Sequence, residues 1–133
     1  MATTSVLSLG APDATGCARS VVLGTRTLAG GPREFCIEQV LPISLADGEF
    51  VVLRVAAPHR FDARVRSRVF VYRLEGLRLV PRFLGSGFTS REVTKLFPLH
   101  HALGLDTLTT TGERETLSCV FDGFPLVCSE PPP

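Results

Sequence analysis

The stretch with the most chemically active side chains runs from Ala57 to Arg68, between two apolar segments. Its candidate ligand-binding residues are His59, Arg60, Phe61, Arg64, Arg66 and Arg68. Guanidinium groups bind phosphate, sulfate and carboxylate bidentately, and long loops on β scaffolds often carry recognition. The segment therefore predicts an anion-binding loop. Arginine at every second position from 64 to 68 equally fits the solvent face of an extending strand, so both interpretations stay open.

Catalytic chemistry has little support in the sequence. The three histidines, His59, His100 and His101, are the candidate bases at neutral pH, and none stands in a recognised catalytic motif. No phosphate-binding glycine loop accompanies them. The sequence favours a non-enzymatic protein, with no catalytic residues and no cofactor expected.

Four cysteines, at positions 17, 36, 119 and 128, allow three disulfide pairings. One pairing has local support, because a hairpin with its loop at 122–125 places Cys119 opposite Cys128. We therefore predict a Cys119–Cys128 disulfide, the alternative being buried, reduced thiols. A disulfide favours a secreted or periplasmic protein over a cytoplasmic one. Without a CxxC motif or a histidine at ligand spacing, no metal site is expected.

The net charge of +1 conceals an uneven distribution. Residues 54–82 hold eight arginines against two acids, whereas the flanking parts are both acidic. Nucleic-acid binding is nevertheless disfavoured, because the net charge is small and the chain has no Trp and one Tyr for base stacking. No apolar run approaches the roughly 20 residues of a transmembrane helix.

Short β-branched and aromatic runs separated by glycine turns predict an all-β fold. Typical runs are Phe50–Val55 and Val69–Tyr72, and turns are expected at Glu75-Gly76 and Asp122-Gly123. At most one or two short helical turns are expected, at residues 89–92 and 99–103.

The two halves of the chain also resemble each other, which predicts an internal repeat within a single domain, 1–133. Both halves contain the pattern apolar-acidic-Gly-apolar-x-Leu-Val, at 74–80 and 121–127. We predict two four-stranded antiparallel units, at about 20–77 and 78–128, arranged as propeller blades or as a two-sheet sandwich. The predicted strands are 20–23, 35–41, 50–55 and 69–74 in the first unit, then 79–84, 92–97, 107–111 and 116–121 in the second.

The run from Arg68 to Ser86 resembles part of a blade of the FG-GAP or VCBS type of β-propeller repeat. The resemblance covers about residues 20–128 and implies roughly two degenerate blades. Blades of this family commonly hold calcium in aspartate-rich loops, but the matching loops here, 44–48 and 101–106, have one acidic residue each, too few for a calcium site. Propellers close with at least four blades, so the resemblance implies association between chains or membership of a larger assembly.

These observations predict a non-enzymatic interaction or scaffold module that binds a protein partner or further copies of itself through strand edges. The alternative function is binding of an anionic ligand or polymer through the Arg-rich loop 57–68.

Overall fold

Every regular element in the computed structural model is a β-strand, so the all-β prediction is confirmed within the described part of the chain. The structure describes residues 6–32, 35–45, 48–56, 67–85, 91–99, 102–109, 111–121 and 126–129.

The strands form three antiparallel sheets in chain order, each a simple meander. Sheet A contains β1 (Leu7–Leu9), β2 (Val21–Leu23) and β3 (Arg26–Thr27). Sheet B contains β4 (Cys36–Leu45), β5 (Gly48–Ala56), β6 (Ser67–Glu75) and β7 (Arg78–Gly85). Sheet C contains β8 (Arg91–Leu99), β9 (Ala102–Thr109), β10 (Arg114–Phe121) and β11 (Leu126–Ser129).

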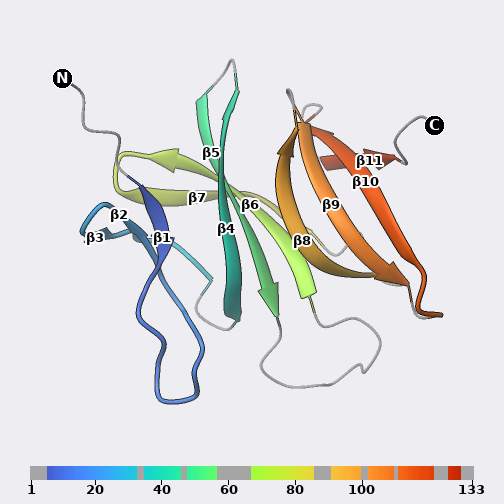
Figure 1. Ribbon diagram of the computed structural model, residues 1–133. Helices are drawn as coiled ribbons and strands as arrows, with labels where there is room; N and C mark the ends of the chain where they lie inside the picture. The colour runs from blue at the N-terminus through green and yellow to red at the C-terminus, as the bar shows by residue number, and fades with distance from the viewer. Residues whose placement is uncertain are drawn as a thin grey trace.

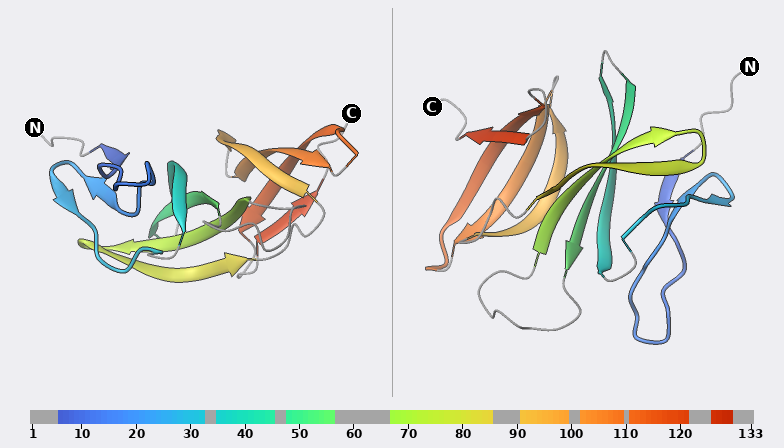
Figure 2. Two further views of the ribbon diagram at one scale, coloured as in Figure 1. Left: turned by 90° about the horizontal axis from the view of Figure 1, so that it is seen from below. Right: turned by 180° about the vertical axis from the view of Figure 1, so that it is seen from behind.

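Sheet B is the middle layer, with sheet A on one side and sheet C on the other (Figures 1 and 2). One apolar core, which includes Val21, Leu28 and Leu53, lies between sheets A and B. A second core, which includes Val52 and Leu105, lies between sheets B and C.

Burial on both faces explains why the central strands read as unbroken apolar runs. In β5, Val51 faces sheet A and Val52 faces sheet C, and both are fully buried. Burying such a side chain contributes roughly 1.5–3 kcal/mol. A strand with two buried faces therefore gains from apolar residues at every position, not at every second one.

Sheets B and C have the same strand order and corresponding strand pairings. In sheet B, Leu53 lies opposite Val40 and Phe70. Leu105 occupies the same place in sheet C, where it lies opposite Leu96 and Leu117. The shared register identifies equivalent residues of the two sheets independently of any sequence similarity.

The two sheets also share an irregularity in the opening strand. The register shifts between Ile37 and Gln39 in β4, and between Val93 and Lys95 in β8. A β-bulge leaves one extra residue on the bulged strand. This residue is Glu38 in β4 and Thr94 in β8. The similarity between sheets B and C therefore extends to the local distortion of the first strand.

The two sheets stack in the same sense. Leu53 of sheet B points toward sheet A, and the equivalent Leu105 of sheet C points toward sheet B. Each sheet thus turns the same face toward the layer that precedes it in the chain.

The predicted repeat boundaries are wrong by one strand. The units are 36–85 and 91–129, and the strand predicted at 20–23 belongs to a third sheet. The strand predicted to open the second unit closes the first, because Glu75 pairs with Arg78 across a two-residue turn. Gly76 adopts a φ of 63° there, a left-handed conformation that glycine reaches without strain.

Neither predicted helical turn is found in the described residues. Leu99 ends β8 and pairs with Ala102 at the start of β9, so this segment forms strand ends. Arg91 and Glu92 begin β8, and residues 89 and 90 lie outside the described part. The β8–β9 pairing takes up the backbone hydrogen bonds that a helical turn would have used.

Candidate functional site

The outer face of sheet C is the candidate site. No described strand lies over this face (Figures 1 and 2). We call it the open face, and its residues are Thr94, Phe97, Leu99, Asp106, Arg114, Thr116, Ser118 and Val120. They alternate along the strands with the side chains that point into the core between sheets B and C.

One half of the open face is polar and hollowed, with a depression of about 400 Å³. Asp106 is held in this depression because the Thr116 hydroxyl donates to its Oδ1 (2.9 Å). The Thr94 hydroxyl donates to the backbone carbonyl of Asp106 (3.1 Å). Arg114 lines the same depression, so a carboxylate, a guanidinium and two hydroxyls meet at one polar surface.

The other half of the open face is apolar. The large aliphatic side chains Leu99 and Val120 are 40% and 45% exposed there. The Phe97 ring lies over Gly104, where an added Cβ would collide with it. Cross-strand packing of an aromatic ring on glycine fills the gap that the missing side chain leaves.

Three edge strands contain proline, which makes them poorly suited to pairing with another strand. Pro42, Pro81 and Pro98 lie in the edge strands β4, β7 and β8, and proline at an edge discourages strand addition. Part of the β7 edge is already occupied, because the Leu79 N–H donates to the Ala29 carbonyl (2.8 Å).

The β8 edge is closed by a side chain from the neighbouring layer. Gln39 in β4 donates from Nε2 to the Leu96 carbonyl (2.6 Å) and accepts from the Leu96 N–H at Oε1 (2.8 Å). The amide thus satisfies a donor and an acceptor of one residue, as a paired strand would. These two hydrogen bonds, which we call the Gln39 clasp, join sheets B and C.

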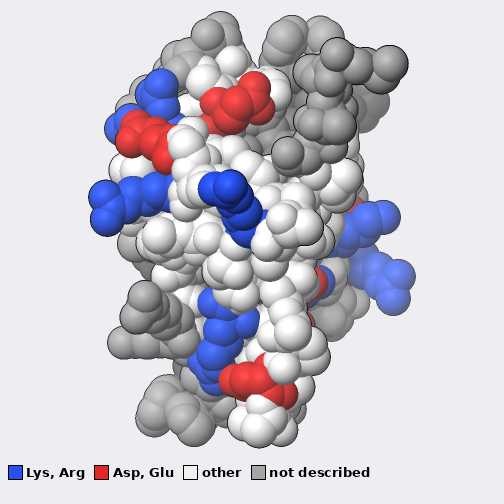
Figure 3. Space-filling model, turned by 90° about the vertical axis from the view of Figure 1, so that its left-hand side faces the viewer, with Lys and Arg blue, Asp and Glu red and all other residues white. Residues whose placement is uncertain are grey.

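Ion pairs partly cancel the positive charge of residues 54–82. Arg54 pairs with Glu38 (3.3 Å), an acid from outside that segment, and Arg73 pairs with Glu75 (3.6 Å). Figure 3 shows basic and acidic side chains interspersed on the side that holds sheet A. The arginines that cluster along the sequence therefore do not form a separate basic surface on that side.

The predicted anion-binding residues lie mostly outside the described part of the chain. His59, Arg60, Phe61, Arg64 and Arg66 belong to this group. Arg68, the sixth, is exposed on β6. The structure therefore neither assembles nor separates these six residues.

The hairpin register predicted for the cysteines is found, with Cys119 opposite Cys128 in the β10–β11 pair. The Cys128 side chain lies outside the described part, so a bond between them stays a prediction. A disulfide that local pattern did not reveal joins Cys17 to Cys36, with 5.0 Å between their Cα atoms. It fastens the β1–β2 connection to the first residue of sheet B.

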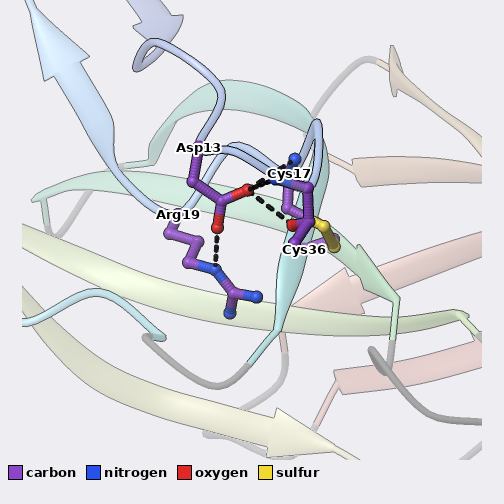
Figure 4. A network of polar contacts seen from close by, with 5 residues as sticks. Asp13, Cys17, Arg19 and Cys36 are labelled. Atoms are coloured by element: carbon purple, nitrogen blue, oxygen red, sulfur yellow. Dashed lines mark hydrogen bonds and ion pairs between the residues drawn. A yellow bond between two sulfur atoms is a disulfide. The ribbon is translucent and has the colours of Figure 1, made fainter.

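Asp13 organises the connection next to that disulfide (Figure 4). Its Oδ1 accepts from the Thr15 hydroxyl (2.5 Å) and from the N–H groups of Thr15 (2.9 Å) and Cys17 (3.2 Å). Its Oδ2 accepts from Arg19 Nε (2.6 Å). The Thr15 hydroxyl, followed by the Arg19 guanidinium and the two N–H donors, holds the pKa of Asp13 well below its usual range.

The described residues contain no group of three or more His, Cys, Asp or Glu side chains placed to bind a metal. They also contain no helix of the length and apolarity needed to cross a bilayer. Comparison with protein-family models, curated proteins and solved structures found no match to this chain.

Proposed function

We propose that this protein is a non-enzymatic β-repeat interaction module that binds another protein through the open face of sheet C. One observation carries the proposal. The equivalent face of sheet B is buried under another sheet, whereas the open face keeps large apolar side chains in solvent.

A residue-by-residue comparison of the two faces supports docking of a partner. Val52 and Val69 of sheet B, both fully buried, correspond to Gly104 and Thr116 of sheet C. The open face is thus more polar than a core but retains Leu99. Interfaces between separately folded partners are about as apolar as the rest of a protein surface, so this mixture is compatible with docking of such a partner.

The stacking also supports the proposed kinship with FG-GAP and VCBS repeats. Four-stranded antiparallel units that stack face to face are the building blocks of propellers. We therefore propose that sheets B and C are blade-like units.

We further propose a secreted or periplasmic location, since the Cys17–Cys36 bond persists best in an oxidising compartment. Intact mass measurement of alkylated, unreduced protein from its native source tests this proposal. Two disulfides are expected, and four alkylated thiols would contradict it.

The experiment for the interaction function is site-specific photo-crosslinking in cells that make the protein. A benzophenone amino acid replaces Ser118 on the open face or, as a control, Leu77 in the β6–β7 turn, which is 42% exposed. A discrete adduct from position 118 and none from position 77 is expected. Absence of an adduct at 118, or equal adducts at both positions, refutes the proposal.

Binding of an anionic ligand through loop 57–68 is the second candidate function. Ala56 and Ser67 are direct Cα partners, so the hairpin could close with far fewer residues than lie between them. Replacing Arg64 and Arg66 by Ala should lower the salt concentration that elutes the protein from heparin. The control with the same charge change replaces the exposed Arg26 and Arg78, and equal shifts for both pairs would discount a specific site.

A further inference from the structure

We infer that the protein assembles head to tail, with the outer face of sheet A of one copy seated on the open face of sheet C of another copy. This inference rests on the proposed function of the open face and names its partner as a second copy of the chain.

The first argument is the sense of stacking. Leu53 and Leu105 show that each sheet presents the same face to the layer before it. A stack of this kind has two different ends, the outer face of sheet A and the open face of sheet C. Contacts between unlike ends are heterologous and generate rings or open chains of copies.

The second argument is that exposed apolar side chains gather at these ends. Val6 is 69% exposed and immediately precedes β1, and because the next residue, Leu7, packs inward, the alternation along the strand places Val6 on the outer side of sheet A. Leu99 and Val120 lie on the open face. These are three of the four exposed large apolar residues in the described chain, and the fourth, Leu77, occupies a turn.

The described residues of the two end sheets differ slightly in net charge, and on the open face itself Asp106 and Arg114 balance each other. The described residues 6–32 carry two arginines and one aspartate, whereas those of sheet C and its turns carry three bases and four acids. Figure 3 looks onto the end that holds sheet A and shows basic side chains with acidic ones among them.

The Gln39 clasp shows how one sheet is joined to the next through a side chain of its first strand. Gln39 reaches across from sheet B to the backbone of Leu96 in the next layer. Its equivalent in sheet C is Lys95, which is exposed and lies opposite Asp106. An ammonium group there can donate to backbone carbonyls of a layer supplied by a second copy.

The test is light scattering of the purified full chain over a range of concentrations, combined with mixing of blocked variants. The wild type should exceed the 14.4 kDa of one chain as concentration rises. Val6→Lys blocks one end and Val120→Lys the other, and each should weaken association roughly 10- to 100-fold, as expected for one lost aliphatic contact per interface. Leu77→Lys is the matched control and should assemble like the wild type.

Mixing provides the decisive measurement. Val6→Lys keeps its open face and Val120→Lys keeps its sheet A face, so an equimolar mixture should form a dimer that grows no further. Val22→Lys, in the outward register of β2, is a second block at the sheet A end, and circular dichroism verifies that each variant is folded. A mixture that stays monomeric, or a dimer formed by Val120→Lys alone, overturns head-to-tail assembly.

The outcomes also separate this inference from the proposed function. A wild type that is monomeric at every concentration refutes self-assembly. If Ser118 crosslinking then yields an adduct with a different protein, the open face still binds a partner. If it yields none, both proposals fail.

Discussion

Replacing Gln39 by Met tests whether the Gln39 clasp holds sheets B and C together. Methionine keeps the length of the side chain and removes both the donor and the acceptor. The Leu96 N–H and C=O, which the clasp satisfies at 2.8 and 2.6 Å, would then lose their partners.

The magnitude follows from the two backbone groups. Each buried polar group left without a partner costs about 1–3 kcal/mol. Gln39 is only partly buried, so water reaches some of the site, and we expect a loss near the lower end, about 2 kcal/mol in all. For a chain of this size, that loss lowers the melting temperature by roughly 6–10 °C.

The assays are urea denaturation and amide hydrogen exchange. Denaturation should give a lower midpoint with an unchanged m-value, since the surface exposed on unfolding stays the same. Exchange at the Leu96 amide should accelerate more than exchange at the sheet A amides. Glu38→Gln is the control, because it removes the ion pair with Arg54 on the same strand but keeps Gln39 and both of its hydrogen bonds to Leu96, and it should cost less than about 1 kcal/mol.

A loss of under about 0.5 kcal/mol for Gln39→Met, within the range of ordinary surface substitutions, would refute the reasoning. So would unchanged protection of the Leu96 amide, because it would mean that water or another group replaces the glutamine at no cost.

Three further predictions concern single residues. Gly30→Ala should cost roughly 2–4 kcal/mol in urea denaturation, because φ is +87° there and an added Cβ would collide with the Leu79 carbonyl oxygen; a loss below about 1 kcal/mol would contradict this. Asp13 has a lower pKa folded than unfolded, so its stabilising effect is complete above about pH 4 and is lost as the pH falls. Asp13→Asn should therefore make the fall in melting temperature below pH 4 shallower, and an unchanged slope would exclude this role. Burial raises the pKa of Tyr72 to about 12, and it is the sole tyrosine of a chain without Trp. Tyrosinate absorbance at 295 nm should be absent at pH 10.5, and the stability should fall above pH 10 because the unfolded chain ionises first; titration near pH 10 in folded protein would refute the burial argument.

Strand identity was predictable from the sequence because β-branched runs and acidic-glycine turns act locally. The acidic-glycine pairs Glu75-Gly76 and Asp122-Gly123 predicted two hairpins, and the register of the second, with Cys119 opposite Cys128, is as predicted. The phase of the repeat was not predictable. Two aligned halves match equally well wherever the unit is said to begin, and only the strand pairing decides it.

Contacts across layers could not be predicted, because they join residues far apart in the chain. Gln39 and Leu96 are separated by 57 positions, and Cys17 and Cys36 by 19, without a local pattern that links them. The open face was missed for the same reason. The open face can be recognised only after the strand pairing shows that the buried Val52 of sheet B and Gly104 of sheet C occupy equivalent positions.

The shared orientation of the stacked sheets gives the molecule a direction that coincides with the direction of protein synthesis. As the chain leaves the ribosome, sheet A emerges before sheet B, and sheet B before sheet C. Each new sheet therefore meets a surface that has already been made and can cover its apolar face at once. Translation itself thus limits the time during which any of these faces is exposed to other unfinished chains.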